Sequence, residues 1–173
     1  ASLIEEIRKT QELTDKPFGV NISMLPGKTQ EALTEDFFAA VLECGVKIVE
    51  TSGRSPEKYI PSLHAAGVKL IHKVPAVRYA KKAEEVGADA VSIVGFECGG
   101  HPGLDDVTTM ALVPRAADEL NVPVLAGGGV ADARGFVAMM ALGADGVMMG
   151  TRFLLSEECD IHTDFKKRLL EAK

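Results

Sequence analysis

The segment 95–103 reads GFECGGHPG and holds the residue best suited to proton chemistry, His101. An imidazole titrates near neutral pH, so it can take a proton from a weakly acidic carbon and return one elsewhere. Gly99 and Gly100 allow the backbone to lie flat against a planar ligand. We therefore expect His101 to be a catalytic base, the alternative being a structural or surface histidine.

Cys98 precedes His101 by three residues, a spacing that also permits a thiol–imidazole pair or two metal ligands. No further Cys or His lies nearby in the sequence, so no metal site is expected. The other two cysteines, Cys44 and Cys159, are far from Cys98 and from each other. We expect all three to be reduced thiols.

Two glycine-containing segments, PVLAGGGVADARG and GVMMGTRF, follow one another near the C-terminus. The first contains Gly127, Gly128 and Gly129 ahead of a helical pattern, which would direct backbone N–H groups and the positive end of a helix dipole at an anion. The second has Gly150 and Thr151 one unit later. We expect the two segments to hold one phosphate, although the glycines would also serve tight turns alone.

Two further polar residues lie where strands are expected to end. Lys73, in HKVP, would bring a positive charge to a ligand, or would lie on the solvent-exposed rim. His72 should face the other side of its strand. Asn21, in GVNIS, is suited to hydrogen-bonding a cofactor edge or to capping a helix.

The elements that must position these residues alternate along the chain. Segments with helical periodicity separate the β-rich runs, and this alternation predicts a parallel sheet. Glycines at 45, 67, 87 and 143 lead from a helix into the next strand and are expected to be left-handed helix ends. The six expected strands are 18–23, 47–52, 69–74, 90–95, 123–128 and 146–151.

This α/β pattern favours a TIM (β/α)8 barrel, whose chemistry lies at the carboxyl ends of the strands. A doubly wound sheet is disfavoured because no G-x-G-x-x-G turn follows the first strand. Six strands do not close an eight-stranded barrel, and the chain opens with a helical pattern that should follow a strand. We expect residues 1–173 to form one truncated domain of about six βα units, with the first two missing and two sheet edges left unpaired. Such edges invite pairing with another chain, including a second copy.

Composition narrows the class of protein. The formal charge is −6 and the acidic and basic residues are dispersed, so there is no basic stripe for nucleic acid. No apolar run approaches the length needed to span a membrane, and no signal-peptide pattern opens the chain. We expect a cytoplasmic protein acting on a small molecule.

The combination of KPFGVNI, HKVP, GFECGGHPG with DDVTT, PVLAGGGVADARG and GADGVMMGTRF resembles the nitronate monooxygenase family, formerly called 2-nitropropane dioxygenases. The resemblance runs over nearly the whole chain. It implies noncovalently bound FMN and oxidation of alkyl nitronates or nitroalkanes by O2 to a carbonyl compound and nitrite. It also implies that His101 is the catalytic histidine and that FMN is contacted by Lys73, Glu97, Gly99, Gly100, Gly127, Gly128, Gly129, Gly150 and Thr151.

Three rival functions stay open from the sequence. A flavin-dependent enoyl-acyl-carrier-protein reductase looks similar in the same loops but takes hydride from a nicotinamide cofactor. A flavin-free barrel could use the same glycines for a sugar phosphate that it isomerises. A catalytically idle flavin-binding or interaction module would also fit the missing strands.

Overall fold

The structure, a computed structural model, describes residues 2–24, 26–100, 103 and 105–172. His101, the predicted base, lies outside the described residues. The fold is one parallel six-stranded sheet whose order β1-β2-β3-β4-β5-β6 follows the sequence. The strands are β1 (Gly19–Met24), β2 (Ile48–Gly53), β3 (Lys69–Val74), β4 (Ala90–Val94), β5 (Val124–Gly127) and β6 (Gly146–Met148).

Strands and helices alternate as predicted, and each strand begins within about one residue of its expected start. The sequential strand order is that of a partial TIM barrel, because a doubly wound sheet reverses its order at a switch point. The helices are α1 (Leu3–Leu13), α2 (Lys28–Glu43), α3 (Ile60–Ala65), α4 (Val77–Glu85), α5 (Thr109–Glu119), α6 (Ala133–Ala141), α7 (Thr151–Leu154) and α8 (Thr163–Glu171).

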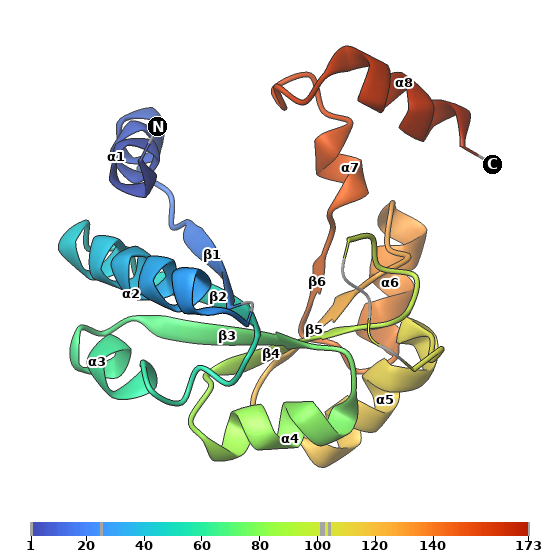
Figure 1. The fold of residues 1–173 in the computed structure, drawn as a ribbon. Helices are drawn as coiled ribbons and strands as arrows, with labels where there is room; N and C mark the ends of the chain where they lie inside the picture. The colour runs from blue at the N-terminus through green and yellow to red at the C-terminus, as the bar shows by residue number, and fades with distance from the viewer. Residues whose placement is uncertain (1, 25, 101–102, 104, 173) are drawn as a thin grey trace.

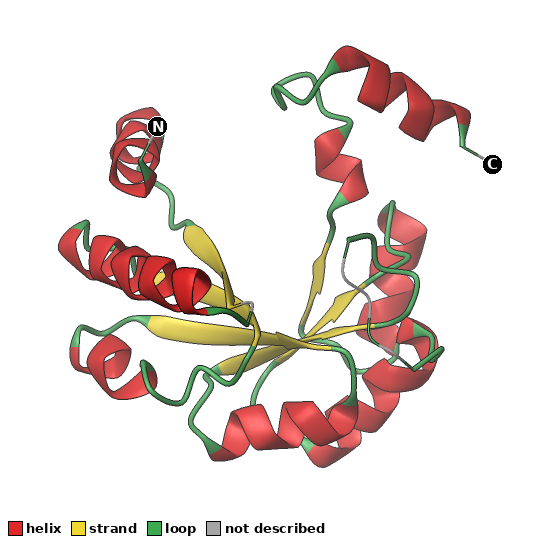
Figure 2. Cartoon of the chain, in the orientation of Figure 1, coloured by secondary structure: helices red, strands yellow, loops and turns green. Residues whose placement is uncertain are grey.

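The sheet is curved and open between β1 and β6, with α2 to α6 around its outer side (Figure 1). Figure 2 shows the strands lining the inside of this arc, while α1 and α8 lie on opposite sides of the opening. The four predicted glycine helix ends are confirmed, since Gly45, Gly67, Gly87 and Gly143 all have positive φ. Each therefore reverses the chain from a helix into the next strand.

The pairing register assigns every strand residue to one of two faces. Ile22, Thr51, His72 and Val91 are aligned across β1 to β4, and all four are buried on the side covered by helices. Their neighbours in sequence point to the inner side of the arc because side chains alternate along a strand. Residues of the inner face include Asn21, Ser23, Glu50, Ser52, Lys73, Ser92 and Met148.

The buried apolar side chains lie mainly between the sheet and its helices. They form three clusters along the sheet, represented by Val49 and Leu63 near β2, by Ala80 and Val91 near β3 and β4, and by Val113 near β5. The three apolar clusters thus follow one another along a single continuous sheet. In the described part of the chain, every helix is too short or too polar to cross a membrane.

Candidate active site at the carboxyl ends of the strands

A cavity of about 540 Å³ opens at the carboxyl ends of the strands. Its inner-face lining comes from five strands and combines polar with apolar side chains, as in other small-molecule sites. Loop 95–103 covers part of it through Cys98, Gly99, Gly100 and Gly103. The strand residues that line it from the inner face are Ser23, Ser52, Lys73, Val94 and Met148.

Lys73 lies within a chain of polar contacts on the inner face. Its Nζ is 3.5 Å from Glu50 Oε2, and Asn21 Nδ2 donates to the same oxygen at 2.5 Å. Glu50 thus connects Asn21 and Lys73, which the sequence predicted as two separate site residues. Asn21 is not a helix cap, because it lies in the middle of β1. It is also not at the strand end, as we had expected, since β1 continues to Met24.

His72 lies on the opposite face from Lys73, as predicted from strand alternation. It is 5% exposed and its Nδ1 is 2.8 Å from Thr51 Oγ1, which is fully buried. Burial lowers the pKa of His72 from about 6.5 to about 4, because charging the ring in an apolar environment is unfavourable. His72 is therefore neutral at pH 7.

Glu97 does not point freely into the cavity. Its two carboxylate oxygens accept from the backbone N–H of Thr109 at 3.1 and 3.2 Å, at the first residue of α5. A carboxylate there is favoured by the helix dipole. Next to it, burial raises the pKa of the Cys98 thiol, and the nearby charge of Lys73 opposes this only in part. Cys98 is thus a protonated thiol at neutral pH rather than a nucleophile.

Close contacts or a positive φ favour glycine at the end of β5 and at the two residues after it. A Cβ at Gly127 would lie 2.8 Å from Val94 and Met148 side-chain atoms, and Gly128 and Gly129 have φ values of +96° and +72°. Gly150 differs, since nothing lies within 4 Å of a Cβ built there and its φ is −103°. The amides of Gly129, Gly150 and Thr151 have no hydrogen-bond partner among the described residues. They are available to an anion.

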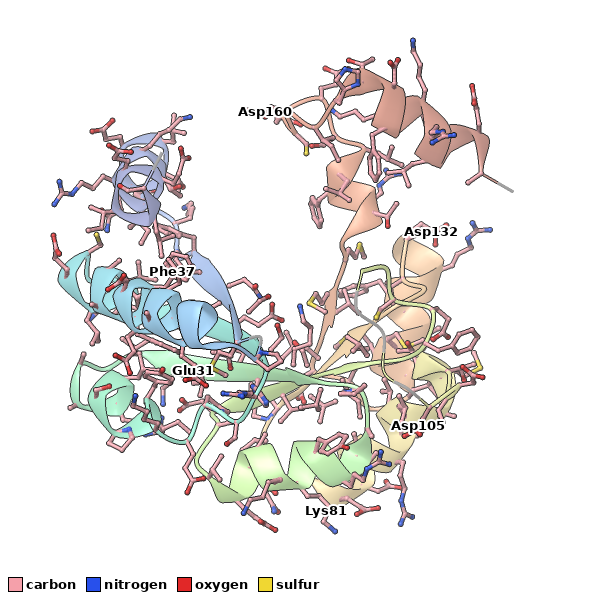
Figure 3. All side chains as sticks on the ribbon, viewed as in Figure 1. Glu31, Phe37, Lys81, Asp105, Asp132 and Asp160 are labelled. Atoms are coloured by element: carbon pink, nitrogen blue, oxygen red, sulfur yellow. The ribbon has the colours of Figure 1, made fainter. Side chains whose placement is uncertain are left out.

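The helix after the glycines contributes less than expected. Asp132 lies at the start of α6 (Figure 3). It caps this helix, because its carboxylate accepts from the backbone N–H groups of Arg134 and Gly135. The Arg134 side chain holds the pKa of Asp132 down at about 2. Two N–H groups that we expected to face a phosphate are therefore already used. The amides of Gly129, Gly150 and Thr151 remain without a partner among the described residues.

Three polar residues escaped the sequence reasoning. Ser92 Oγ, on the inner face beside Lys73, is the buried side-chain polar atom without a partner among the described residues. Glu50 was given no role from the sequence, and Thr109 occurred only within the motif DDVTT. A pair of threonines just before an apolar helical run was the available signal for Thr109. The orphan hydroxyl of Ser92 and the open amides fit a bound polar cofactor.

Cys44, Cys98 and Cys159 are free thiols in the described structure. Across residues 2–24, 26–100, 103 and 105–172, no three His, Cys, Asp or Glu side chains gather as metal ligands. The alternative pair of Cys98 with His101 falls outside the described residues and stays untested.

Comparison with known proteins gives the family and the fold. The family model described as Nitronate monooxygenase matches residues 1–173. A curated relative from Rhodococcus jostii (strain RHA1) is 40% identical over 168 residues, which is 95% of this chain and 44% of the relative. It is named (3aS,4S,5R,7aS)-5-hydroxy-7a-methyl-1-oxo-octahydro-1H-indene-4-carboxyl-CoA dehydrogenase.

Two solved structures share the fold. FabK from Thermotoga maritima is 40% identical with a TM-score of 0.91, over 99% of this chain and 53% of that protein. Nitroalkane oxidase from Streptomyces ansochromogenes is 26% identical with a TM-score of 0.84, over 95% of this chain and 58% of that protein. The chain thus spans about half the length of the relatives that it matches.

Proposed function

The chain belongs to the nitronate monooxygenase family, and from that premise we propose that it forms the FMN site of an enzyme that oxidises alkyl nitronates or nitroalkanes with O2. The products are a carbonyl compound and nitrite. The observation that carries the proposal is the cavity at the strand ends, where Lys73, Gly99 and Gly100 lie together immediately before His101. The likeness to a nitroalkane oxidase supports the substrate class.

Backbone amides and one cation hold the cofactor in this proposal. The phosphate lies against the amides of Gly128, Gly129, Gly150 and Thr151, since loop N–H groups form anion sites. The cavity would take the flavin ring, and the positive charge of Lys73 would stabilise negative charge on that ring. FMN bound there would supply the redox chemistry between the substrate and O2. The other residues proposed for the cofactor site are Asn21, Glu97, Gly99, Gly100 and Gly127. Asn21 acts there through its hydrogen bond to Glu50, and Glu97 acts through its hydrogen bonds to Thr109.

His101 is the proposed base, on the strength of the sequence. It takes the α-proton of a neutral nitroalkane, whereas a nitronate has already lost that proton. Replacing His101 by Asn should therefore abolish oxygen uptake with the nitroalkane and spare most of the uptake with the matching nitronate. Equal loss with both substrates would remove His101 from the role of base and leave it a role in binding.

A second candidate is dehydrogenation of a hydroxylated carboxyl-coenzyme A ester. The observation in its favour is the 40% identity to the Rhodococcus jostii dehydrogenase named for such a substrate. Anaerobic mixing separates the two: bleaching of the flavin by a coenzyme A ester, but not by a nitronate, would favour the dehydrogenase. Bleaching only by a reduced nicotinamide would favour an enoyl reductase, and a protein that never retains flavin would favour a phosphate-binding isomerase.

A further inference from the structure

Thr109 joins two loops that the proposed function places on either side of the cofactor. It is the first residue of α5 and is 1% exposed. Its Oγ1 accepts from the N–H of Gly95, at the start of loop 95–103, at 3.1 Å. The same Oγ1 lies 2.8 Å from the carbonyl oxygen of Gly127, the last residue of β5, and 3.1 Å from that of Gly128, the next residue. One hydroxyl thus touches both loops.

The single hydroxyl proton of Thr109 has three acceptors within reach, the third being Glu97 Oε2 at 3.3 Å. Gly127 O already receives the N–H of Gly95 at 3.2 Å. Gly128 O has no other donor among the described residues. A hydrogen bond from the Thr109 hydroxyl to Gly128 O satisfies an acceptor that has no other donor among the described residues. A hydrogen bond to the Glu97 carboxylate instead bonds the hydroxyl to the other loop.

The glycines around Thr109 are fitted to it. A Cβ at Gly95 would lie 2.2 Å from Thr109 N and 2.5 Å from Thr109 Oγ1. A Cβ at Gly128 would lie 3.0 Å from Thr109 Oγ1 and 3.1 Å from Cys98 N. Such distances exclude or strain any larger residue, so both loops approach the threonine as closely as backbone allows. The contact is specific in shape as well as in hydrogen bonding.

We propose that Thr109 is a positioning residue that fixes the phosphate-binding loop 127–129 relative to loop 95–100, which leads directly into His101. The proposal rests on the proposed function for the roles of the two loops, but the mechanical link is a property of the chain itself. Without the hydroxyl, Gly128 O loses its donor, and the N–H of Gly95 loses one of its two acceptors and keeps only Gly127 O. Both loops should then loosen together, although they are far apart in sequence.

Amide hydrogen exchange of the whole chain, without flavin or substrate, tests the link. Thr109→Val keeps the size of the side chain and removes the hydroxyl. Losing a buried hydrogen bond of this kind should speed exchange in segments 95–100 and 127–129 by about tenfold. Thr109→Ser should restore protection of both. Because the exchange is measured without a ligand, its result does not depend on whether the chain binds flavin or oxidises a nitronate.

Two further variants separate positioning from general destabilisation. Thr51→Val also removes a buried hydroxyl, the one bonded to His72 on the helix side of the sheet, and should leave both loops protected. Glu97→Ala removes only the contacts that the Glu97 carboxylate makes to Thr109, which belong to loop 95–100, so it should speed exchange in 95–100 and spare 127–129. If Thr109→Val changed only the start of α5, or if Thr51→Val loosened the loops equally, Thr109 would not be a positioning residue. Should Thr109→Val fail to fold, Thr109→Ser and Glu97→Ala are compared instead. Faster exchange in 95–100 than in 127–129, seen in Glu97→Ala but not in Thr109→Ser, would support the link. Equally faster exchange of both segments in Glu97→Ala would contradict it.

Discussion

Lys73 Nζ lies 3.5 Å from Glu50 Oε2 across the β2–β3 pair, on the inner face of the sheet. The side chains of both residues are largely buried, with exposed fractions of 28% and 20%. Glu50 in turn accepts from Asn21, so its carboxylate is fixed from the strand on the other side. This arrangement holds one positive charge at the edge of the cavity where we place the flavin ring.

Replacing Lys73 by Met should weaken FMN binding by about tenfold or more, because a charge-assisted hydrogen bond contributes roughly 1.5–3 kcal/mol. Fluorescence quenching of FMN on titration with the chain measures this. The matched control is Lys69→Met, at the other end of the same strand, where the lysine is exposed and bonded to Asp89. Equal weakening in both variants would show that Lys73 acts only through general charge.

Gly150→Ala should leave the free energy of unfolding within about 0.5 kcal/mol of the original, since its φ suits any residue and its Cβ meets open space. The same change should weaken FMN binding, because the Cβ would occupy the space of the phosphate. Chemical denaturation and FMN titration give the two quantities. Unchanged FMN affinity would remove Gly150 from the phosphate site.

Gly128→Ala is expected to behave differently from Gly150→Ala. Its φ of +96° and the contact of its Cβ with Thr109 should cost about 1–2 kcal/mol of stability. Urea denaturation should therefore show a lower midpoint for this variant with an unchanged slope. A stability equal to that of the Gly150 variant would contradict the close fit of Gly128 against Thr109.

The buried neutral His72 predicts that stability falls in mild acid. The pKa is depressed to about 4 in the folded chain and is near 6.5 when the ring is exposed, so the unfolded state binds the proton first. The contribution is complete above pH 6.5, falls as the pH drops from 6.5 to 4, and amounts to about 3 kcal/mol. Urea denaturation from pH 7.5 to 4.5 tests this. His72→Asn keeps an acceptor for Thr51 and should flatten the dependence over that range; an equal slope in the variant would assign the acid sensitivity to other groups.

The sequence was sufficient for the order of the elements and for much of the strand-end geometry. Glycine helix ends and β-rich runs are local signals, which is why the sheet and the opposite orientations of His72 and Lys73 could be predicted. The links made by Thr109 and Glu50 could not, because they depend on segments that meet only after the sheet forms. The role of Asp132 could have been predicted from the sequence, because an aspartate just before a helix is a common N-cap. The adjacent glycines instead led to the prediction that the N–H groups of this helix bind an anion.

The most direct test of the central claim is oxygen consumption by the chain after incubation with FMN and gel filtration, on addition of an alkyl nitronate. Our account predicts a retained flavin spectrum, oxygen uptake that depends on the nitronate, and release of nitrite. A chain that retains flavin but consumes no oxygen with any nitronate would contradict the proposed reaction. A chain that retains no flavin would contradict the proposal that these residues form the FMN site.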